Sequence, residues 1–256
     1  MGLKFEVKNR IAYITIDRPD AANAMDMEVL QGLDKALREY RDNDDIRAAI
    51  ITGSGERVFS AGVDLKQISG FILENRNKPW RFPVDMWRGV ELWKPLIAAI
   101  NGTAAGAGLE LALACDLRIA SEKAKFSFPE VGLGDFPGWG GSQRLARFVS
   151  QCKAAEMLML GYPMDAQEAY RIGMINKVVP PDQVMAAAEE WAQRLTEVAP
   201  LALKAIKESI LRGSVLPLEE GLSLEWKLIV PLLGSEDIQE ATKAFLEKRK
   251  PDFKGK

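Results

Sequence analysis

The sequence predicts an α/β fold followed by a helical C-terminal domain, on three observations. The segments Arg47 to Thr52 and Pro95 to Ile100 are apolar runs of the kind that a strand buried on both faces needs. The second run continues into a turn of small residues, Asn101 to Gly108, and then into an apolar helix. From residue 153 onward the pattern is helical. Strands first and helices last indicate α/β repeats packed against a helical domain.

The first third of the chain supplies the opening elements of the α/β part. Strands over 5–8 and 11–16 form a hairpin, closed by Lys8, Asn9 and Arg10. Asp26 is placed to cap a helix over 27–41, in which apolar residues recur at helical spacing. The run 58–66 turns from a strand into another helix.

The middle of the chain places two glutamates near turns. An apolar helix over 109–115 contains Glu110, and short strands over 117–120 and 124–128 end at Pro129 and Glu130. A segment rich in glycine follows at 132–141, where the backbone must turn tightly or approach a ligand closely. Ser142 is placed to cap the next helix.

The C-terminal part is predicted to be helical, and the break at Pro180 and Pro181 divides the chain into a core over 1–180 and a helical domain over 181–256. The helices are expected over 153–160, 165–172, 182–199, 201–211, 218–232 and 235–248.

Residues 70 to 94 read as irregular and carry three tryptophans, Trp80, Trp87 and Trp93. These side chains either form a packed helical lid over the core or line a ligand pocket, and the two interpretations are compatible because small-molecule pockets are mainly apolar.

The composition limits the partners and the catalytic groups that this chain can use. The chain has 256 residues, 47% of them hydrophobic, and a net charge of −2, so nothing indicates a nucleic-acid partner. Its two cysteines and the absence of an export signal or of a membrane-spanning apolar run favour the cytoplasm. The sequence contains 0 histidines, so acid–base groups must come from Asp, Glu, Lys, Tyr or Cys, with carboxylates favoured, and triads or metal sites built on imidazole are excluded.

The segment Gly106-Ala-Gly-Leu-Glu110 has three interpretations. It partly matches a dinucleotide fingerprint, but Leu111 stands where the third glycine belongs. Alternatively, the small residues only allow close packing, and Glu110 is a buried, hydrogen-bonded carboxylate. In the third interpretation, N–H groups at the helix start form an anion hole, and the loop Ala61-Gly62-Val63 supplies a second donor. Two donors and two carboxylates are what an enolate reaction requires.

Several motifs, in their order, resemble the enoyl-CoA hydratase, or crotonase, family. They are Arg18-Pro19 with Asn23-Ala24, Phe59-Ser-Ala-Gly-Val-Asp-Leu65, Lys94-Pro95 with Ala98-Ala-Ile-Asn-Gly102, Gly106-Ala-Gly-Leu-Glu-Leu-Ala112, Cys115-Asp116, Phe128-Pro-Glu130, Leu133-Gly134, Pro137-Gly138, Gly140-Gly-Ser-Gln-Arg-Leu145 and Ala244-Phe-Leu-Glu-Lys-Arg-Lys250.

The resemblance implies a crotonase-like spiral of ββα units with a C-terminal helical domain, homotrimers or homohexamers, and acyl-CoA thioester substrates. It implies catalytic roles for Glu110 and Glu130, with the N–H groups of Val63 and Ala107 as the oxyanion hole. Contacts with coenzyme A or the substrate are implied for Ala61, Val63, Asp64, Leu65, Lys66, Ala107, Gly108, Phe245 and Lys248. No metal or other cofactor is implied, since coenzyme A is part of the substrate.

The expected activity is hydration of a 2-enoyl-CoA to a 3-hydroxyacyl-CoA, with a bulky or cyclic acyl group as one hypothesis from the tryptophans. A double-bond isomerase of the same family, which typically needs only the carboxylate at Glu130, is the nearest alternative. A non-catalytic CoA-binding protein is the alternative from another class. Asp135 reads as a turn residue, although some relatives with other chemistries carry a functional acid nearby.

Overall fold

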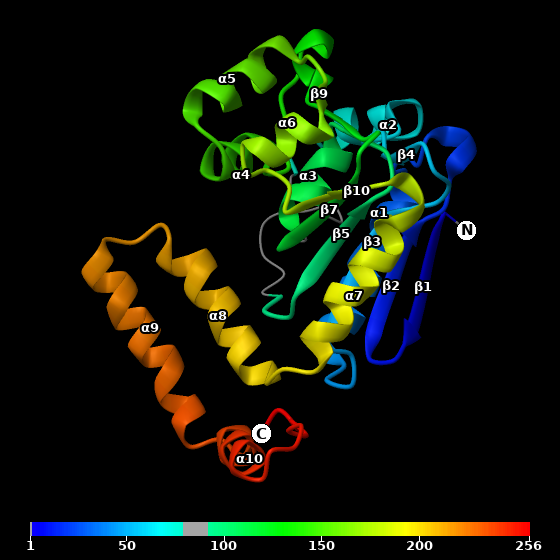
Figure 1. Cartoon of the computed structure of the whole chain (residues 1–256). Coiled ribbons are helices and arrows are strands. Elements are labelled where there is room, and N and C mark those ends of the chain that lie inside the picture. Colours follow the sequence, from blue (N-terminus) through cyan, green and yellow to red (C-terminus); the bar gives the residue numbers. More distant parts are fainter. Residues whose placement is uncertain (1, 79–91) are drawn as a thin grey trace.

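The strands form two sheets in the computed structural model, which describes residues 2–78 and 92–256 (Figure 1). In that part of the chain, the larger sheet has six strands in the order β1-β2-β3-β5-β7-β10, and the smaller has four in the order β4-β6-β8-β9. Strands β3 to β8 alternate between the two sheets, so the chain winds as a spiral, as predicted. The bounds are β1 Leu3–Lys8, β2 Ile11–Ile16, β3 Ala48–Gly53, β4 Val58–Ser60, β5 Leu96–Ile100, β6 Thr103–Ala105, β7 Leu117–Ser121, β8 Lys125–Ser127, β9 Met164–Asp165 and β10 Lys177–Val179.

The larger sheet is parallel except at its first strand. β1 and β2 form the predicted antiparallel hairpin, whereas β2, β3, β5, β7 and β10 pair in parallel. Every residue of β3 and β5 is buried, which explains why their sequences are continuous apolar runs.

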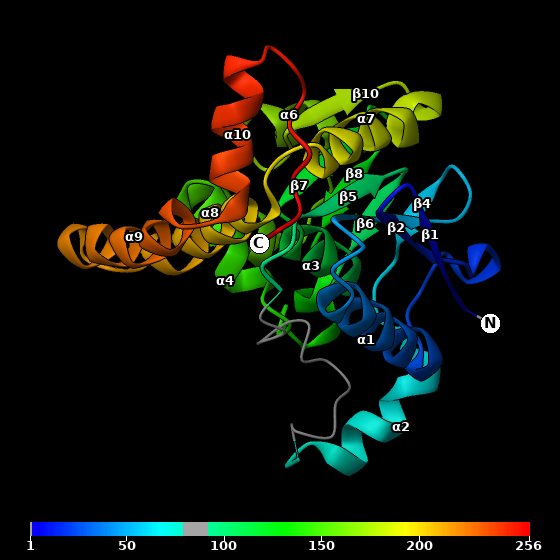
Figure 2. The ribbon, with the colours of Figure 1, turned by 90° about the horizontal axis from the view of Figure 1, so that it is seen from below.

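Helices cover both faces of this sheet. Ala49 and Ile51 of β3 join the cluster that contains α1 (Met27–Asp42) and α3 (Ala107–Ala114). The alternate residues, Ala48 and Ile50, join the cluster that contains α7 (Val184–Thr196), because successive side chains of a strand point to opposite faces. Figure 2 shows α7 and α1 on opposite sides of the sheet.

Local signals place some helix ends correctly and miss others. The Asp26 carboxylate accepts the N–H of Val29, as expected of the cap of α1. The prediction that Ser142 caps α4 (Gly141–Phe148) is wrong, because the cap residue is Gly140 in a left-handed conformation. The helix containing Glu110 begins at Ala107, two residues earlier than predicted. Further helices are α5 Gln151–Leu160 and α6 Ala166–Arg171, with short 3-10 turns η1 Pro19–Ala21, η4 Pro129–Leu133 and η5 Pro181–Gln183.

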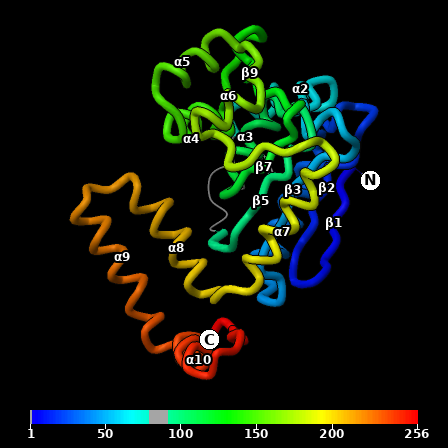
Figure 3. The backbone as a smooth tube through the Cα atoms, in the orientation of Figure 1, coloured from blue at the N-terminus to red at the C-terminus, as the bar shows by residue number. Residues whose placement is uncertain are grey.

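The last three helices leave the core. α8 (Pro200–Gly213) and α9 (Leu218–Leu233) run side by side, and α10 (Glu236–Leu246) follows near the C-terminus (Figure 3). α7 packs on the sheet although it lies beyond Pro180 and Pro181, so the division expected there remains a prediction.

The region predicted as irregular begins with a helix, because α2 (Leu65–Asn75) continues beyond residue 70. Trp80 and Trp87 lie outside the described residues. Trp93 is half-buried, and the Arg212 guanidinium carbon lies 4.9 Å from the centre of its ring, so this tryptophan packs against α8. None of the helices within the described ranges is long and apolar enough to cross a membrane.

Candidate active site

Glu110 is buried at the first turn of α3, where the partial positive charge of a helix start favours a carboxylate. Its side chain is only 2% exposed. Oε1 accepts two hydrogen bonds, from the N–H groups of Trp139 and Gly141, both at 2.7 Å. There is no room for a side chain at Gly141, since a Cβ there would lie 2.9 Å from Oε1.

Burial raises the pKa of Glu110 from 4.5 to about 7. The two N–H groups and the positive charge of Arg144 lower it, while the negative charge of Glu130 raises it. Near neutral pH this group therefore exchanges a proton readily, as a general acid or base must.

Glu130 lies in η4, half-buried beside the start of α3. Its Oε2 is buried, and no hydrogen-bond partner lies within the described residues. A Cβ at Gly106, whose φ is +54°, would lie 2.9 Å from Oε1, so a glycine is required where this carboxylate meets α3. Burial raises the pKa of Glu130, and the negative charge of Asp135 adds to the increase.

Two backbone N–H groups, of Val63 and Ala107, lie near the start of α3. The N–H of Met25 donates to the carbonyl of Gly62 at 2.7 Å, and the N–H of Asp64 donates to the carbonyl of Met25 at 2.9 Å. In this parallel bridge the residue between the two bonds, Val63, directs its own N–H away from Met25. A Cβ at Gly62 would lie 3.2 Å from the nitrogen of Ala107, which places the two segments in close proximity. Neither Val63 nor Ala107 donates a backbone hydrogen bond to a described residue.

The family model for enoyl-CoA hydratase/isomerase matches residues 6–256. The chain belongs to this family. A (E)-benzylidenesuccinyl-CoA hydratase from Thauera aromatica is 39% identical over 255 residues and covers 100% of both chains. A short-chain-enoyl-CoA hydratase from Clostridium acetobutylicum is 39% identical, covering 96% of this chain and 94% of its own.

Solved structures agree. An enoyl-CoA hydratase from Bacillus anthracis superimposes with a TM-score of 0.93 at 35% identity, covering 100% of both chains. An enoyl-CoA hydratase subunit from Geobacillus kaustophilus gives a TM-score of 0.91 at 38% identity, covering 100% of this chain and 99% of the other. The crotonase-like fold and the family predicted from the sequence are therefore confirmed, and the dinucleotide-fold interpretation is set aside.

The segment that the family resemblance assigns to coenzyme A lies next to Val63. Ala61, Leu65 and Lys66 are exposed, whereas Gly108 is buried against the backbone of Ser60. Asp64 is held by Arg18, whose Nη2 lies 3.1 Å from Oδ2. The contacts of these residues with coenzyme A stay a prediction.

Two expected contact residues are not brought to the glutamates within one chain. Phe245 lies in α10 and is 82% exposed, and Lys248 follows that helix with a φ of +52°. Figure 1 places α10 beyond α8, far from α3 and α4.

Sequence reasoning missed the residues that hold Glu110. Trp139 and Gly141 contribute through their N–H groups, which no side-chain pattern reveals, and the sequence offers Arg144 only as one residue of the family motif Gly140 to Leu145. The glycine density of 132–141 was the available signal. Asp135 is exposed, and its carboxylate accepts the N–H of Phe136 at 2.8 Å, which fits the predicted turn role.

Proposed function

We propose that this chain is an enoyl-CoA hydratase that uses Glu110 and Glu130 as its acid–base pair. Full-length relatives near 39% identity are named enoyl-CoA hydratases, which supports the activity predicted from the sequence. The observation that carries the assignment of residues is a pair of carboxylates with raised pKa, Glu110 in the first turn of α3 and Glu130 beside it in η4. They lie near two backbone N–H groups that donate to no backbone carbonyl of the described residues.

The thioester oxygen accepts the N–H groups of Val63 and Ala107. Oε1 of Glu110 is held by two N–H groups, and no described residue bonds Oε2, so Oε2 takes a proton from water. The water oxygen then bonds to C3, and the electrons of the double bond move toward the thioester oxygen, where the N–H groups stabilise the enolate. Glu130, which starts protonated, delivers its proton to Cα as the thioester carbonyl re-forms. Glu110 then gives up the proton that it took from water, and Glu130 takes one up, so both carboxyl groups return to their starting states. Only protein groups act, and coenzyme A enters as part of the substrate.

Replacing Glu110 with Gln tests this assignment. The amide keeps an oxygen for the two N–H groups but cannot take a proton. The rate of hydration, measured as the loss of enoyl-thioester absorbance, is therefore expected to fall by at least about a hundredfold. Glu130→Gln is expected to show a comparable loss, and Glu122→Gln, at an exposed position, none. Full activity in Glu110→Gln would overturn the proposal.

The same variants separate the alternatives. An isomerase that needs only Glu130 would keep its double-bond shift in Glu110→Gln and lose it in Glu130→Gln. A CoA-binding protein without turnover would leave the absorbance unchanged even with the unaltered chain.

A bulky or cyclic acyl group is the proposed substrate class. A relative is named for benzylidenesuccinyl-CoA, and the loop that holds Glu110 carries Trp139, half-buried, and Phe136, which is 66% exposed. These aromatic side chains add to the sequence hypothesis based on Trp80 and Trp87, which lie outside the described residues, whereas Trp93 packs against α8. A panel of enoyl-CoA thioesters is expected to show higher kcat/KM for cyclic than for short linear acyl groups, and equal values would contradict this substrate class.

The helical domain is proposed to form homotrimers or homohexamers. α8 and α9 contain no buried residue in the isolated chain, and large apolar side chains on both are exposed. Phe245 and Lys248 would then meet coenzyme A on a neighbouring copy, since they lie far from this chain's own glutamates. A cytoplasmic location is proposed because Cys115 and Cys152 are both free thiols.

A further inference from the structure

The turn that holds Glu110, residues 139–141, is itself bonded by the guanidinium of Arg144. Trp139 and Gly141 donate their N–H groups to the Glu110 carboxylate. Arg144 of α4 contacts the same turn, because its Nη1 donates to the carbonyl of Trp139 at 3.1 Å. Between the two donors, a Cβ at Gly140 would overlap Nη1 of Arg144. The guanidinium therefore occupies the space that a side chain at residue 140 would fill.

Arg144 stands where a helix does not favour a cation. α4 begins at Gly141, and the N–H of Arg144 bonds the carbonyl of Gly140 at 2.8 Å, so Arg144 lies in the first turns of the helix. Side chains of a helix point back toward its N-terminus, where partial positive charge repels a cation. Burial also lowers the pKa of Arg144, while the negative charge of Glu110 raises it. The stability of α4 therefore does not account for an arginine here.

We infer that Arg144 is a positioning residue, which fixes the turn of residues 139–141 and through it the orientation and charge of the Glu110 carboxylate. This inference rests on the proposed catalytic role of Glu110. Arg144 acts through the carbonyl of Trp139, whose own N–H holds Glu110, so a change at one side of this peptide segment is transmitted to the other.

The charged groups around Glu110 set the sign of the expected pH effect. Glu130 faces it from η4 and raises its pKa, and Arg144 faces it from α4 and lowers its pKa. Arg144 is also faced by the Cys115 thiol at the end of α3, whose pKa is raised to about 12, so this thiol carries no charge near neutral pH. Removing the charge of Arg144 therefore raises the pKa of Glu110.

Arg144→Gln and Arg144→Lys test the inference, with Arg147→Gln as the matched control. Arg147 lies on the same helix, is exposed, and among the described residues bonds only Gln143. In Arg144→Gln we expect kcat to fall about tenfold with little change in KM, because the lost contacts orient a catalytic group and do not bind substrate. The acidic limb of the kcat/KM profile is expected to move to higher pH.

Arg144→Lys keeps the positive charge and is expected to return the acidic limb toward that of the unaltered chain. Arg147→Gln is expected to leave both the limb and kcat unchanged. The inference fails if Arg144→Gln, folded by circular dichroism, keeps the limb of the unaltered chain. If Arg144→Gln does not fold, Arg144→Lys decides through kcat, which the inference expects to fall because an ammonium does not reproduce the guanidinium contacts with the turn, and unaltered kcat in folded Arg144→Lys would overturn it.

Glu110→Gln, assayed alongside, separates the two proposals. If Glu110→Gln remains fully active, the proposed function falls regardless of Arg144. If Glu110→Gln loses hydration while Arg144→Gln keeps the rate and the limb of the unaltered chain, only the inference about Arg144 falls.

Discussion

Glu110 carries a cost in stability that its chemistry explains. Its folded-state pKa of about 7 lies above the ordinary value of 4.5, so between these pH values the folded chain binds more protons than the unfolded chain. The free energy of unfolding therefore falls as pH rises from about 4.5 to about 7, and the loss persists above pH 7. The shift corresponds to at most about 3 kcal/mol.

Glu110→Gln is therefore expected to be more stable than the unaltered chain at pH 8, by up to about 3 kcal/mol, while it loses activity. The neutral amide keeps an acceptor for both N–H groups and removes the buried charge. Urea denaturation at pH 8 and at pH 5 checks this, because the gain is expected to shrink at the lower pH. Glu122→Gln, at an exposed position, is expected to change neither value. A less stable Glu110→Gln at pH 8 would mean that hydrogen bonding to the charge outweighs its burial.

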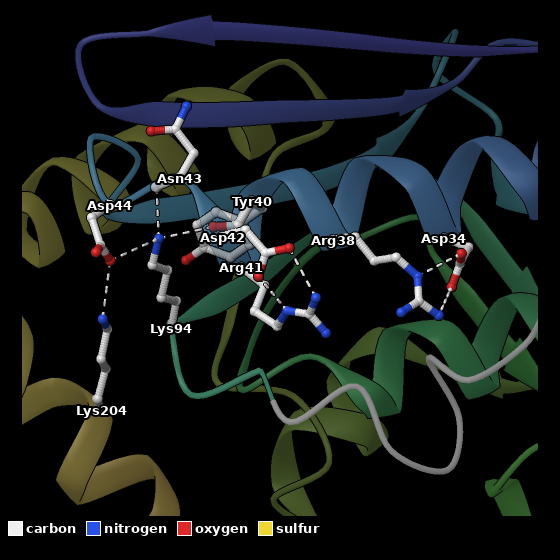
Figure 4. A network of polar contacts seen from close by, with 9 residues as sticks. All are labelled: Asp34, Arg38, Tyr40, Arg41, Asp42, Asn43, Asp44, Lys94 and Lys204. Carbon is white, nitrogen blue, oxygen red and sulfur yellow. Dashed lines mark hydrogen bonds and ion pairs between the residues drawn. The ribbon is translucent and has the colours of Figure 1, made fainter.

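At the scale of elements, Lys94 joins the end of α1 to the start of β5. Its side chain is 5% exposed, and its ammonium donates to the carbonyls of Tyr40 and Asn43 at 2.9 and 2.7 Å (Figure 4). Both carbonyls lie at the C-terminus of α1, where a helix leaves carbonyls unbonded and favours a cation. Burial lowers the pKa of Lys94. This lysine thereby fixes the strand from which the chain continues to α3 and Glu110.

Lys94→Met is expected to cost roughly 1–3 kcal/mol of unfolding free energy, because it removes the buried hydrogen bond to the Tyr40 carbonyl, whereas the Asn43 carbonyl keeps the N–H of Ile46. Lys204→Met is the matched control, since Lys204 contacts the exposed Asp44 and is expected to contribute less than about 1 kcal/mol. Chemical denaturation of both variants measures the difference, and equal losses would show that Lys94 acts only as an exposed ion pair.

Elements whose signals are local were predictable. β3 and β5 follow from apolar runs, and α1 follows from Asp26 and the spacing of apolar residues after it. α4 was misplaced because a left-handed glycine cap leaves no side-chain signal, unlike the serine beside it. Glu110 and Glu130 could be named from the sequence. The partners of Glu110 could not, because they lie 29 and 31 positions away and act through backbone N–H groups.

At the scale of the molecule, the C-terminal helices were predictable as helices but not in their placement. Apolar spacing predicted α8, α9 and α10, yet Figures 1 and 2 show them extending away from both sheets. Helical periodicity shows which face of a helix is apolar, and does not show whether that face meets its own core or another copy. The exposed apolar side chains of α8 and α9 support the proposal that this face meets another copy.

Trp226 provides the test of that assembly. It lies on α9, is 66% exposed, and has the large apolar side chain that typically dominates an interface. Trp226→Glu places a charge on that face, and we expect the assembly to dissociate toward monomers in light scattering coupled to size exclusion. Lys227→Glu, the exposed neighbour on the same helix, reverses a charge and is expected to leave the mass unchanged.

Because Phe245 and Lys248 would be lost from the neighbouring site, KM for the thioester is expected to rise in Trp226→Glu even though Glu110 and Glu130 are intact. An unaltered mass would place the interface elsewhere, and a monomer with unaltered KM would show that each chain binds coenzyme A alone.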